Sequence, residues 1–122
     1  MRILDLFTGN EKTASFKKNL KNVLGFSPGN ILLYRAALTH RSVRETADEN
    51  NERLEYLGDA ILSAIVADFL FKKYPYREEG FLTEMRSKMV NRNKLNEIAL
   101  KMGIKKITYY NKFDNSLKVS QI

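Results

Sequence analysis

Three acids stand at helical spacing in the stretch NERLEYLGD, residues 51–59. On an α-helix, which turns about 100° per residue, Glu52, Glu55 and Asp59 lie within about 60° of one another. Carboxylates on one face supply oxygen ligands that can hold a metal ion together. The spacing therefore indicates a metal site as one interpretation.

The same acids also have a structural interpretation. Acids in a first helical turn are stabilised by the helix dipole, by about 0.3–1 kcal/mol. This effect is enough to explain Glu52, and whether it also explains Glu55 stays open. Asp59 is two turns in, and we expect it to be buried, where an unpaired carboxylate requires a cation or a proton. Gly58 weakens a helix by roughly 1 kcal/mol relative to Ala, so we expect another backbone to pack closely there. Metal ligand and paired structural acid both remain open.

The elements that must position these acids are helices. A long helix is predicted from about Glu52 to Tyr74, stopped by Pro75, and because its second half is apolar all round we expect it at the centre of the fold. A polar loop is predicted over residues 40–51. The remaining predicted helices end at Gly25, run from Asn30 to Leu38, follow Gly80, and run from Asn93 to Gly103.

Some residues outside these helices have weaker signals. Residues 104–122 show no helical period, although Ile107, Tyr109 and Phe113 hint at a short extended piece. His40, the only histidine, is expected to be a hydrogen-bonded residue between helices because it cannot form a histidine-based metal site alone. Tyr109 and Tyr110 could stack on bases, but tyrosines near a chain end more often pack on their own core.

The charge balance points to a polyanionic partner. The formal net charge is +7 and the pI is about 9.7, which favours nucleic acid, with a merely solvated basic surface as the alternative. Six of the fourteen acids fall within residues 45–59, so an acidic spot lies on a basic chain, as a metal-dependent phosphodiester site would need. Candidates for an RNA-facing surface, or for ordinary solvated positions, are Arg86, Lys88, Arg92 and Lys94.

Composition also limits the cellular compartments in which the protein is expected. The chain has no cysteine, which excludes disulfides and thiolate metal sites and fits a reducing compartment. Its longest apolar run, residues 60–71, contains Asp68 and is too short to span a bilayer. We expect a single-domain, cytoplasmic protein with no membrane partner.

The stretch NERLEYLGDAIL, residues 51–62, resembles the signature helix of the ribonuclease III catalytic domain, with Tyr56 where phenylalanine is common. ALTHRS at residues 37–42 resembles the motif upstream of that signature, and residues 78–99 resemble the segment downstream. The resemblance covers roughly residues 15–104. Because a long signature occurs with both flanks in order, it is far more specific than a short isolated motif.

The resemblance implies an all-α endonuclease domain that cuts double-stranded RNA with Mg²⁺, Mn²⁺ being possible, and that works as a homodimer. Glu55 and Asp59 match the family's catalytic metal-site acids. Glu52 and Glu79 match acids near its substrate cleft. Tyr56 matches the aromatic residue that enters a socket on the partner subunit, and on the helical wheel it lies about 100° from Glu55, away from the acids.

The sequence departs from the family in two ways. The family has two further metal-site acids, an aspartate and a glutamate three residues later, and no acid after Asp59 matches them. The double-stranded-RNA-binding domain is absent as well. We therefore interpret residues 1–122 as the N-terminal portion of a catalytic domain, incomplete at the C-terminus and inactive alone, and we favour truncation over a complete protein. Three hypotheses remain: an endoribonuclease, a non-catalytic RNA-binding relative, or a helical dimerisation module whose acids serve folding only.

Overall fold

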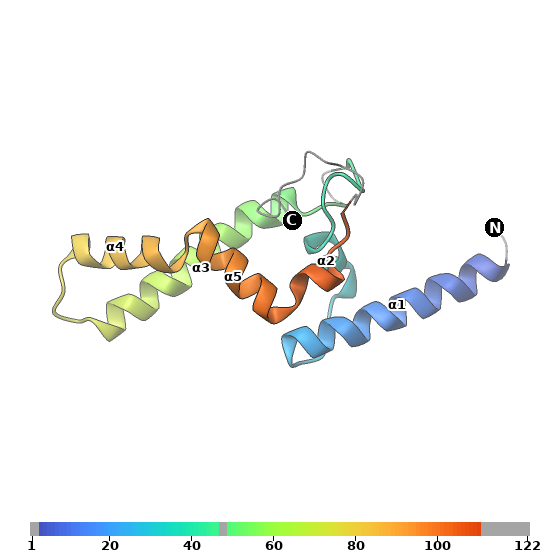
Figure 1. The fold of residues 1–122 in the computed structure, drawn as a ribbon, viewed down its shortest axis with the longest axis horizontal. Helices are drawn as coiled ribbons and strands as arrows, with labels where there is room; N and C mark the ends of the chain where they lie inside the picture. Colours follow the sequence, from blue (N-terminus) through green and yellow to red (C-terminus); the bar gives the residue numbers. More distant parts are fainter. Residues whose placement is uncertain (1–2, 47–48, 111–122) are drawn as a thin grey trace.

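The described residues of the computed structural model form an all-α fold, as predicted. They are residues 3–46 and 49–110, with side chains described from Glu11 onward. In Figure 1, α4 returns alongside α3 at one end of the molecule, and α1 extends away at the other. The helices are α1 (Ile3–Leu24), α2 (Ile31–Ala37), α3 (Glu52–Lys73), α4 (Glu79–Met89), α5 (Arg92–Met102) and the short 3-10 turn η1 (Ile104–Ile107).

Helix ends follow the capping residues of the sequence. Gly25 (φ 78°) and Gly103 (φ 77°) take the left-handed conformation after α1 and α5, which glycine adopts without a Cβ clash. The Asn30 side chain accepts a hydrogen bond from the third residue of α2 (3.3 Å). One predicted boundary is wrong by about two residues: α5 uses Asn91 as its N-cap, rather than starting after Asn93.

The tightest packing surrounds the middle of α1. Phe16 and Leu20 are almost fully buried. The Arg35 guanidinium lies 5.1 Å from the centroid of the Phe16 ring, and the Tyr109 ring lies 5.9 Å from it. Thr39 is buried and pairs with Tyr109 in a parallel bridge. We call these five residues the α1 junction. Tyr109 is extended as predicted and packs against Phe16, although 43% of its surface stays exposed. The prediction is wrong at Ile107, which lies in the 3-10 turn η1, and Phe113 lies outside the described residues.

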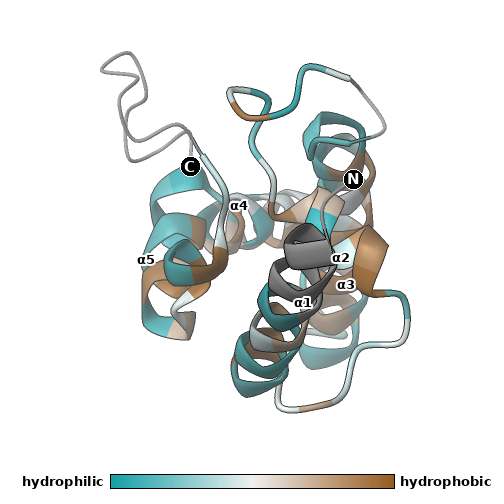
Figure 2. Cartoon of the chain, turned by 90° about the vertical axis from the view of Figure 1, so that its right-hand side faces the viewer, coloured by the Kyte–Doolittle hydropathy of each residue, from teal (hydrophilic) through white to brown (hydrophobic). Residues whose placement is uncertain are grey.

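The predicted central position of α3 is wrong for the described chain. Leu70 is the only residue of α3 that is buried, and the 22-residue helix is covered mainly by α4 and α2 (Figure 1). Figure 2 shows hydrophobic stretches along α3. Four apolar side chains at i, i+4 spacing are about half exposed, and we call them the outer stripe: Leu57, Ile61, Ile65 and Phe69. No described element buries this face, although Leu57 also lines a hollow that α3 shares with α2.

None of the helices within the described residues is both long enough and apolar enough to cross a membrane.

Candidate functional site

The first two turns of α3 bring the three predicted acids together. Glu52, Glu55 and Asp59 line one open hollow of about 470 Å³, and Leu95 of α5 lies on its other wall. Leu62, one turn beyond Asp59 on the same side of α3, also lines it and is half-buried. The acids therefore face α5, while the outer stripe faces away. We call this the acid hollow.

Two expectations about this helix are wrong in the described chain. Asp59 is exposed rather than buried, so the fold itself does not require a cation or a proton there. Gly58 has no heavy atom within 4 Å of the position that a Cβ would take, so no backbone approaches it closely. The physical reason is the same for both: within the described residues, α5 covers this part of α3 only loosely.

The three acids differ in their partners. The Glu52 carboxylate forms an ion pair with Arg41 Nη1 at 3.2 Å, with both side chains largely exposed. Among the ion pairs and side-chain hydrogen bonds of the described residues, none involves Glu55 or Asp59. Within the described chain, therefore, no side-chain partner supports the interpretation of Asp59 as a paired structural acid.

The donor set fits magnesium in type but not in number. Exposed carboxylates are suitable oxygen ligands, and magnesium keeps several waters when it binds one or two of them. Glu55 and Asp59 could provide such a pair. In the parts of the chain that the structure describes, no three Asp, Glu, His or Cys residues come close enough to hold a metal ion. A tightly held ion would thus need further ligands from elsewhere.

Glu79 lies away from the acid hollow. It begins α4, accepts a hydrogen bond from Thr83 Oγ1 (2.7 Å), and lines a different hollow together with Asp68 and Arg86. Asp68 is thirteen residues after Glu55, a rise of about 20 Å along a helix. One copy of the chain does not bring Glu79 to the other predicted acids.

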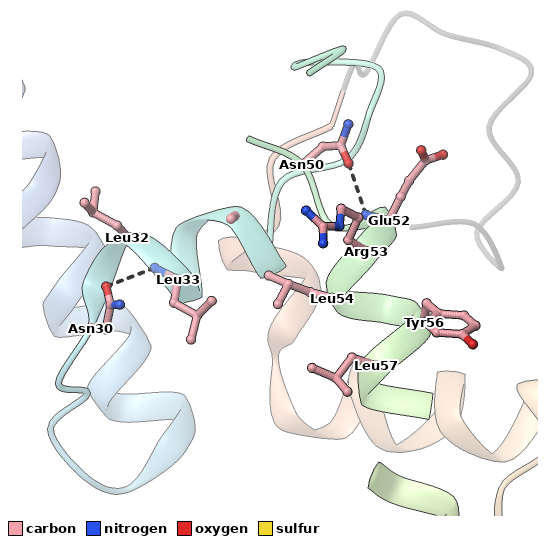
Figure 3. Close-up of a pocket in the computed structure, with 10 residues that line it drawn as sticks. Asn30, Leu32, Leu33, Asn50, Glu52, Arg53, Leu54, Tyr56 and Leu57 are labelled. Carbon is pink, nitrogen blue, oxygen red and sulfur yellow. Dashed lines mark hydrogen bonds between the residues drawn. The ribbon is translucent and has the colours of Figure 1, made fainter. Parts of the chain in front are cut away.

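Tyr56 stands between two hollows. It is 84% exposed and borders both the acid hollow and a larger apolar hollow of about 920 Å³ between α2 and α3, where Leu32 and Leu33 are also exposed. Figure 3 shows its ring on the opposite side of α3 from Leu57. The expectation that Tyr56 points away from the acids is therefore wrong, because it shares their hollow.

The loop before α3 contains polar residues whose importance the sequence pattern did not reveal. Asn50 and Thr39 are the buried polar residues among those described. Asn50 bonds to the backbone of both Arg44 and Glu52. Adjacent asparagines at positions 50 and 51 indicate the start of a helix. They do not reveal which of the two side chains accepts the hydrogen bond from the first N–H of the helix. His40 is hydrogen-bonded as expected, but its Nδ1 pairs with Ser42 of the same loop rather than with a residue of a helix.

Comparisons with known proteins agree with this helix arrangement. A family model described as Ribonuclease-III-like matches residues 30–121. The nuclease domain of ribonuclease III from Campylobacter jejuni has a TM-score of 0.72 and 32% sequence identity, covering 80% of this chain and 67% of that one. That structure is described as showing structural flexibility in a region involved in dimer formation.

Individual relatives are similar over the same part. Ribonuclease 3 from Bacteroides thetaiotaomicron is 48% identical over 92 residues, covering 72% of this chain and 30% of the relative. Ribonuclease 3 from Flavobacterium psychrophilum is 42% identical over 93 residues, covering 73% of this chain and 38% of the relative. The chain thus spans about a third of the length of these relatives. It belongs to the ribonuclease III family. The part of the family that it matches is the nuclease domain, which confirms the resemblance found in the sequence.

Proposed function

We propose that this chain acts in the cytoplasm as part of a ribonuclease III-type endoribonuclease that hydrolyses double-stranded RNA with magnesium. The observation that carries the proposal is the pair Glu55 and Asp59. These carboxylates stand one turn apart in the family's signature helix, exposed and without a cationic partner among the described residues. A carboxylate pair left free in a basic chain suits a metal ion that must meet a phosphate backbone.

The residues of the hollow then have distinct roles. Glu55 and Asp59 hold Mg²⁺, or Mn²⁺ in its place. When bound, such an ion lowers the pKa of an attacking water and offsets charge on the leaving oxygen. Glu52, held by Arg41 at the edge of the hollow, borders the substrate cleft, as does Glu79. Because Glu79 is remote within one chain, a cleft with both acids would be built from two copies.

The proposed partner in that assembly is a second copy of the chain. The outer stripe leaves four apolar side chains about half exposed, and Tyr56 is more exposed still. Covering such surface is favourable by about 25 cal/mol per Å² of apolar area. The described dimer-forming region of the Campylobacter jejuni nuclease domain supports the same expectation. We therefore propose a homodimer with Tyr56 as an interface residue.

The basic residues provide attraction for RNA. Of the four candidates, Lys88 pairs with Glu84 (2.6 Å) and Lys94 with Glu97 (3.0 Å), while Arg86 lines the hollow of Glu79. Exposed pairs of this kind are weak and exchange partners readily. Binding to duplex RNA should therefore weaken steeply as salt rises, because it depends on counterion release.

A cleavage assay tests the proposal. The chain alone should not cut long duplex RNA with magnesium, because two carboxylates on one helix cannot fix the ion against the scissile phosphate and align the water. A chimera that continues with the C-terminal part of the Bacteroides thetaiotaomicron enzyme, and with it the second acidic pair, should make staggered cuts. Asp59→Asn should abolish these cuts. The control Asp68→Asn, on the same helix but paired with Lys72, should retain them.

The other outcomes separate the remaining hypotheses. Specific cleavage by the short chain that is lost in Asp59→Asn would mean that further ligands lie within it, with Glu79 and Asp114 the first to test; Asp114 lies outside the described residues. If neither protein cuts RNA but both bind it, a non-catalytic RNA-binding relative is favoured. If neither binds RNA, a dimerisation module is favoured.

Metal binding can be tested without cleavage. Magnesium or manganese should raise the melting temperature of the chain, and Asp59→Asn should abolish that response. Without metal, Asp59→Asn should raise the melting temperature slightly, because like charges at i, i+4 repel by about 0.2–0.5 kcal/mol. Asp68→Asn is again the control and should respond to metal normally. A less stable Asp59→Asn variant with a normal metal response would show that Asp59 is a structural acid.

A further inference from the structure

Asn50 is the most buried polar residue of the described chain, with 2% of its surface exposed. Its side-chain amide uses both ends. The Nδ2 group donates to the backbone oxygen of Arg44 (3.0 Å), and Oδ1 accepts from the backbone N–H of Glu52 (3.1 Å), a bond drawn in Figure 3. One partner is an acceptor and the other a donor, so the orientation of the amide is defined.

The bond to Glu52 replaces a missing helix cap. The first N–H groups of an α-helix have no partner within the helix. Asn51 occupies the N-cap position of α3, but its side chain makes no capping bond and its backbone is helical (φ −85°, ψ −6°). The side-chain acceptor at the start of α3 therefore comes from Asn50, one residue earlier.

The same loop is attached to the α1 junction. The backbone N–H of Asn51 donates to the Thr39 oxygen (2.9 Å), and the N–H of His40 donates to the Tyr109 oxygen (2.8 Å). Arg41, next in the loop, forms the ion pair with Glu52. The start of α3 is thus held from one side by backbone bonds and from within by Asn50. The two acids of the first turn, Glu52 and Glu55, follow directly.

We propose that Asn50 is a positioning residue for the acid hollow. By fixing the backbone of Glu52, its side chain sets the first turn of α3 and so the direction in which Glu52 and Glu55 present their carboxylates. This role rests on the proposed metal function, since a carboxylate needs a fixed direction only if it has a ligand to meet. Neither aspartate nor serine reproduces both bonds, because an ionised aspartate has no donor and serine has one oxygen in place of the separate donor and acceptor atoms of the amide.

The test compares three variants of the whole chain. Asn50→Ala removes both bonds. Asn50→Ser keeps an acceptor short enough to reach the Glu52 N–H but loses the donor to Arg44. Asn51→Ala changes the neighbouring asparagine, which makes no capping bond, and is the matched control. Two quantities are measured by NMR on ¹⁵N-labelled protein: hydrogen exchange of the Glu52 amide, and the Mn²⁺ affinity from paramagnetic broadening of the Glu55 and Asp59 amide signals.

We expect Asn50→Ala to speed exchange at Glu52 by about tenfold, as for the loss of one good hydrogen bond, and to weaken Mn²⁺ binding several-fold. Asn50→Ser should restore most of both quantities even though its melting temperature stays lowered by the lost Arg44 bond. Asn51→Ala should match the wild type. Rescue by serine without recovery of stability distinguishes positioning from general stabilisation.

Three results would contradict the positioning role of Asn50 or the proposed metal function. Wild-type exchange and Mn²⁺ affinity in Asn50→Ala would overturn the positioning role. An Asn50→Ser variant with the same exchange rate and Mn²⁺ affinity as Asn50→Ala would overturn it as well. If Asn50→Ala does not fold, an Asn50→Ser variant that differs from the wild type in both quantities would overturn it instead. If the wild type itself shows no Mn²⁺ broadening at Glu55 and Asp59, the proposed metal function fails, and exchange at Glu52 alone then decides whether Asn50 fixes the first turn.

Discussion

The α1 junction and the outer stripe of α3 both contain large apolar side chains, but the chain covers these side chains to different extents. In the junction, Phe16 and Leu20 keep 4% and 2% of their surface exposed. In the outer stripe, Ile61 and Ile65 keep 50% and 61%. In the junction, Phe16 is contacted by Arg35 of α2 and by Tyr109 after η1, whereas no described element buries the stripe.

Because of this difference, we expect the junction to determine the stability of the chain and the stripe to determine its assembly. Fully burying a Leu, Ile or Phe side chain contributes about 1.5–3 kcal/mol relative to leaving it exposed. The junction has already gained this contribution within one chain. The side chains of the stripe, which are about half exposed, have gained about half of this burial free energy. The other half can be gained only when a partner covers them. We expect changes in the junction to alter unfolding, and changes beside the stripe to alter association.

The largest effect is expected from Phe16→Ala. The ring contacts Tyr109 and lies beneath the Arg35 guanidinium, so truncation should leave a cavity and lower the free energy of unfolding by about 3–5 kcal/mol. Urea unfolding followed by circular dichroism measures it. Phe26→Ala is the control, because Phe26 is 54% exposed and should cost little. Equal losses in the two variants would mean that the junction is not the main core.

An intermediate effect is expected from Tyr56→Ala, on association rather than unfolding. An aromatic anchor in an interface commonly contributes about 2 kcal/mol or more, so the dimer dissociation constant should rise by about thirtyfold or more. Sedimentation velocity over a concentration series measures it. Tyr76→Ala is the matched control, since Tyr76 is 98% exposed on the turn between α3 and α4. A wild-type chain that stays monomeric at high concentration would contradict the proposed homodimer.

Much of the fold could be predicted from local sequence. Gly25, Pro75 and Gly103 end helices through backbone geometry that acts on the residues beside them, so the observed ends agree with the pattern within a residue or two. The acids share a hollow because helical spacing alone brings Glu52 and Asp59 to one side of α3. Such features depend on a few neighbouring residues and are visible without tertiary structure.

Burial and long-range pairing could not be predicted in this way. A wheel assigns Asp59 and Gly58 to a face but does not tell what covers that face, and both expectations of close packing were wrong. Thr39 and Tyr109 are 70 positions apart, and no local signal joins them. The choice between two adjacent asparagines at the start of α3 also depends on the loop that folds over Asn50.

The smallest effect is expected on α5, away from both regions. Hydrogen bonds from Lys101 and then Lys94, with the charge of Lys94, hold the pKa of the Glu97 carboxyl below its ordinary value. A lowered folded-state pKa contributes stability that is present above the ordinary glutamate pKa and is lost as the pH falls through the folded-state value. Glu97→Gln should therefore lower the urea midpoint slightly at neutral pH and not at strongly acidic pH.

Added salt should reduce this difference, because the Glu97 side chain is 47% exposed and salt screens exposed charges. Glu84→Gln, which removes a single lysine partner, Lys88, should change the midpoint less than Glu97→Gln does. A difference for Glu97→Gln that persists in strongly acidic solution or in high salt would mean that the residue contributes through packing on α5 rather than through its charge. In that case the outer helices would also take part in the stable core, and the contrast between junction and surface would be weaker than the burial of their side chains indicates.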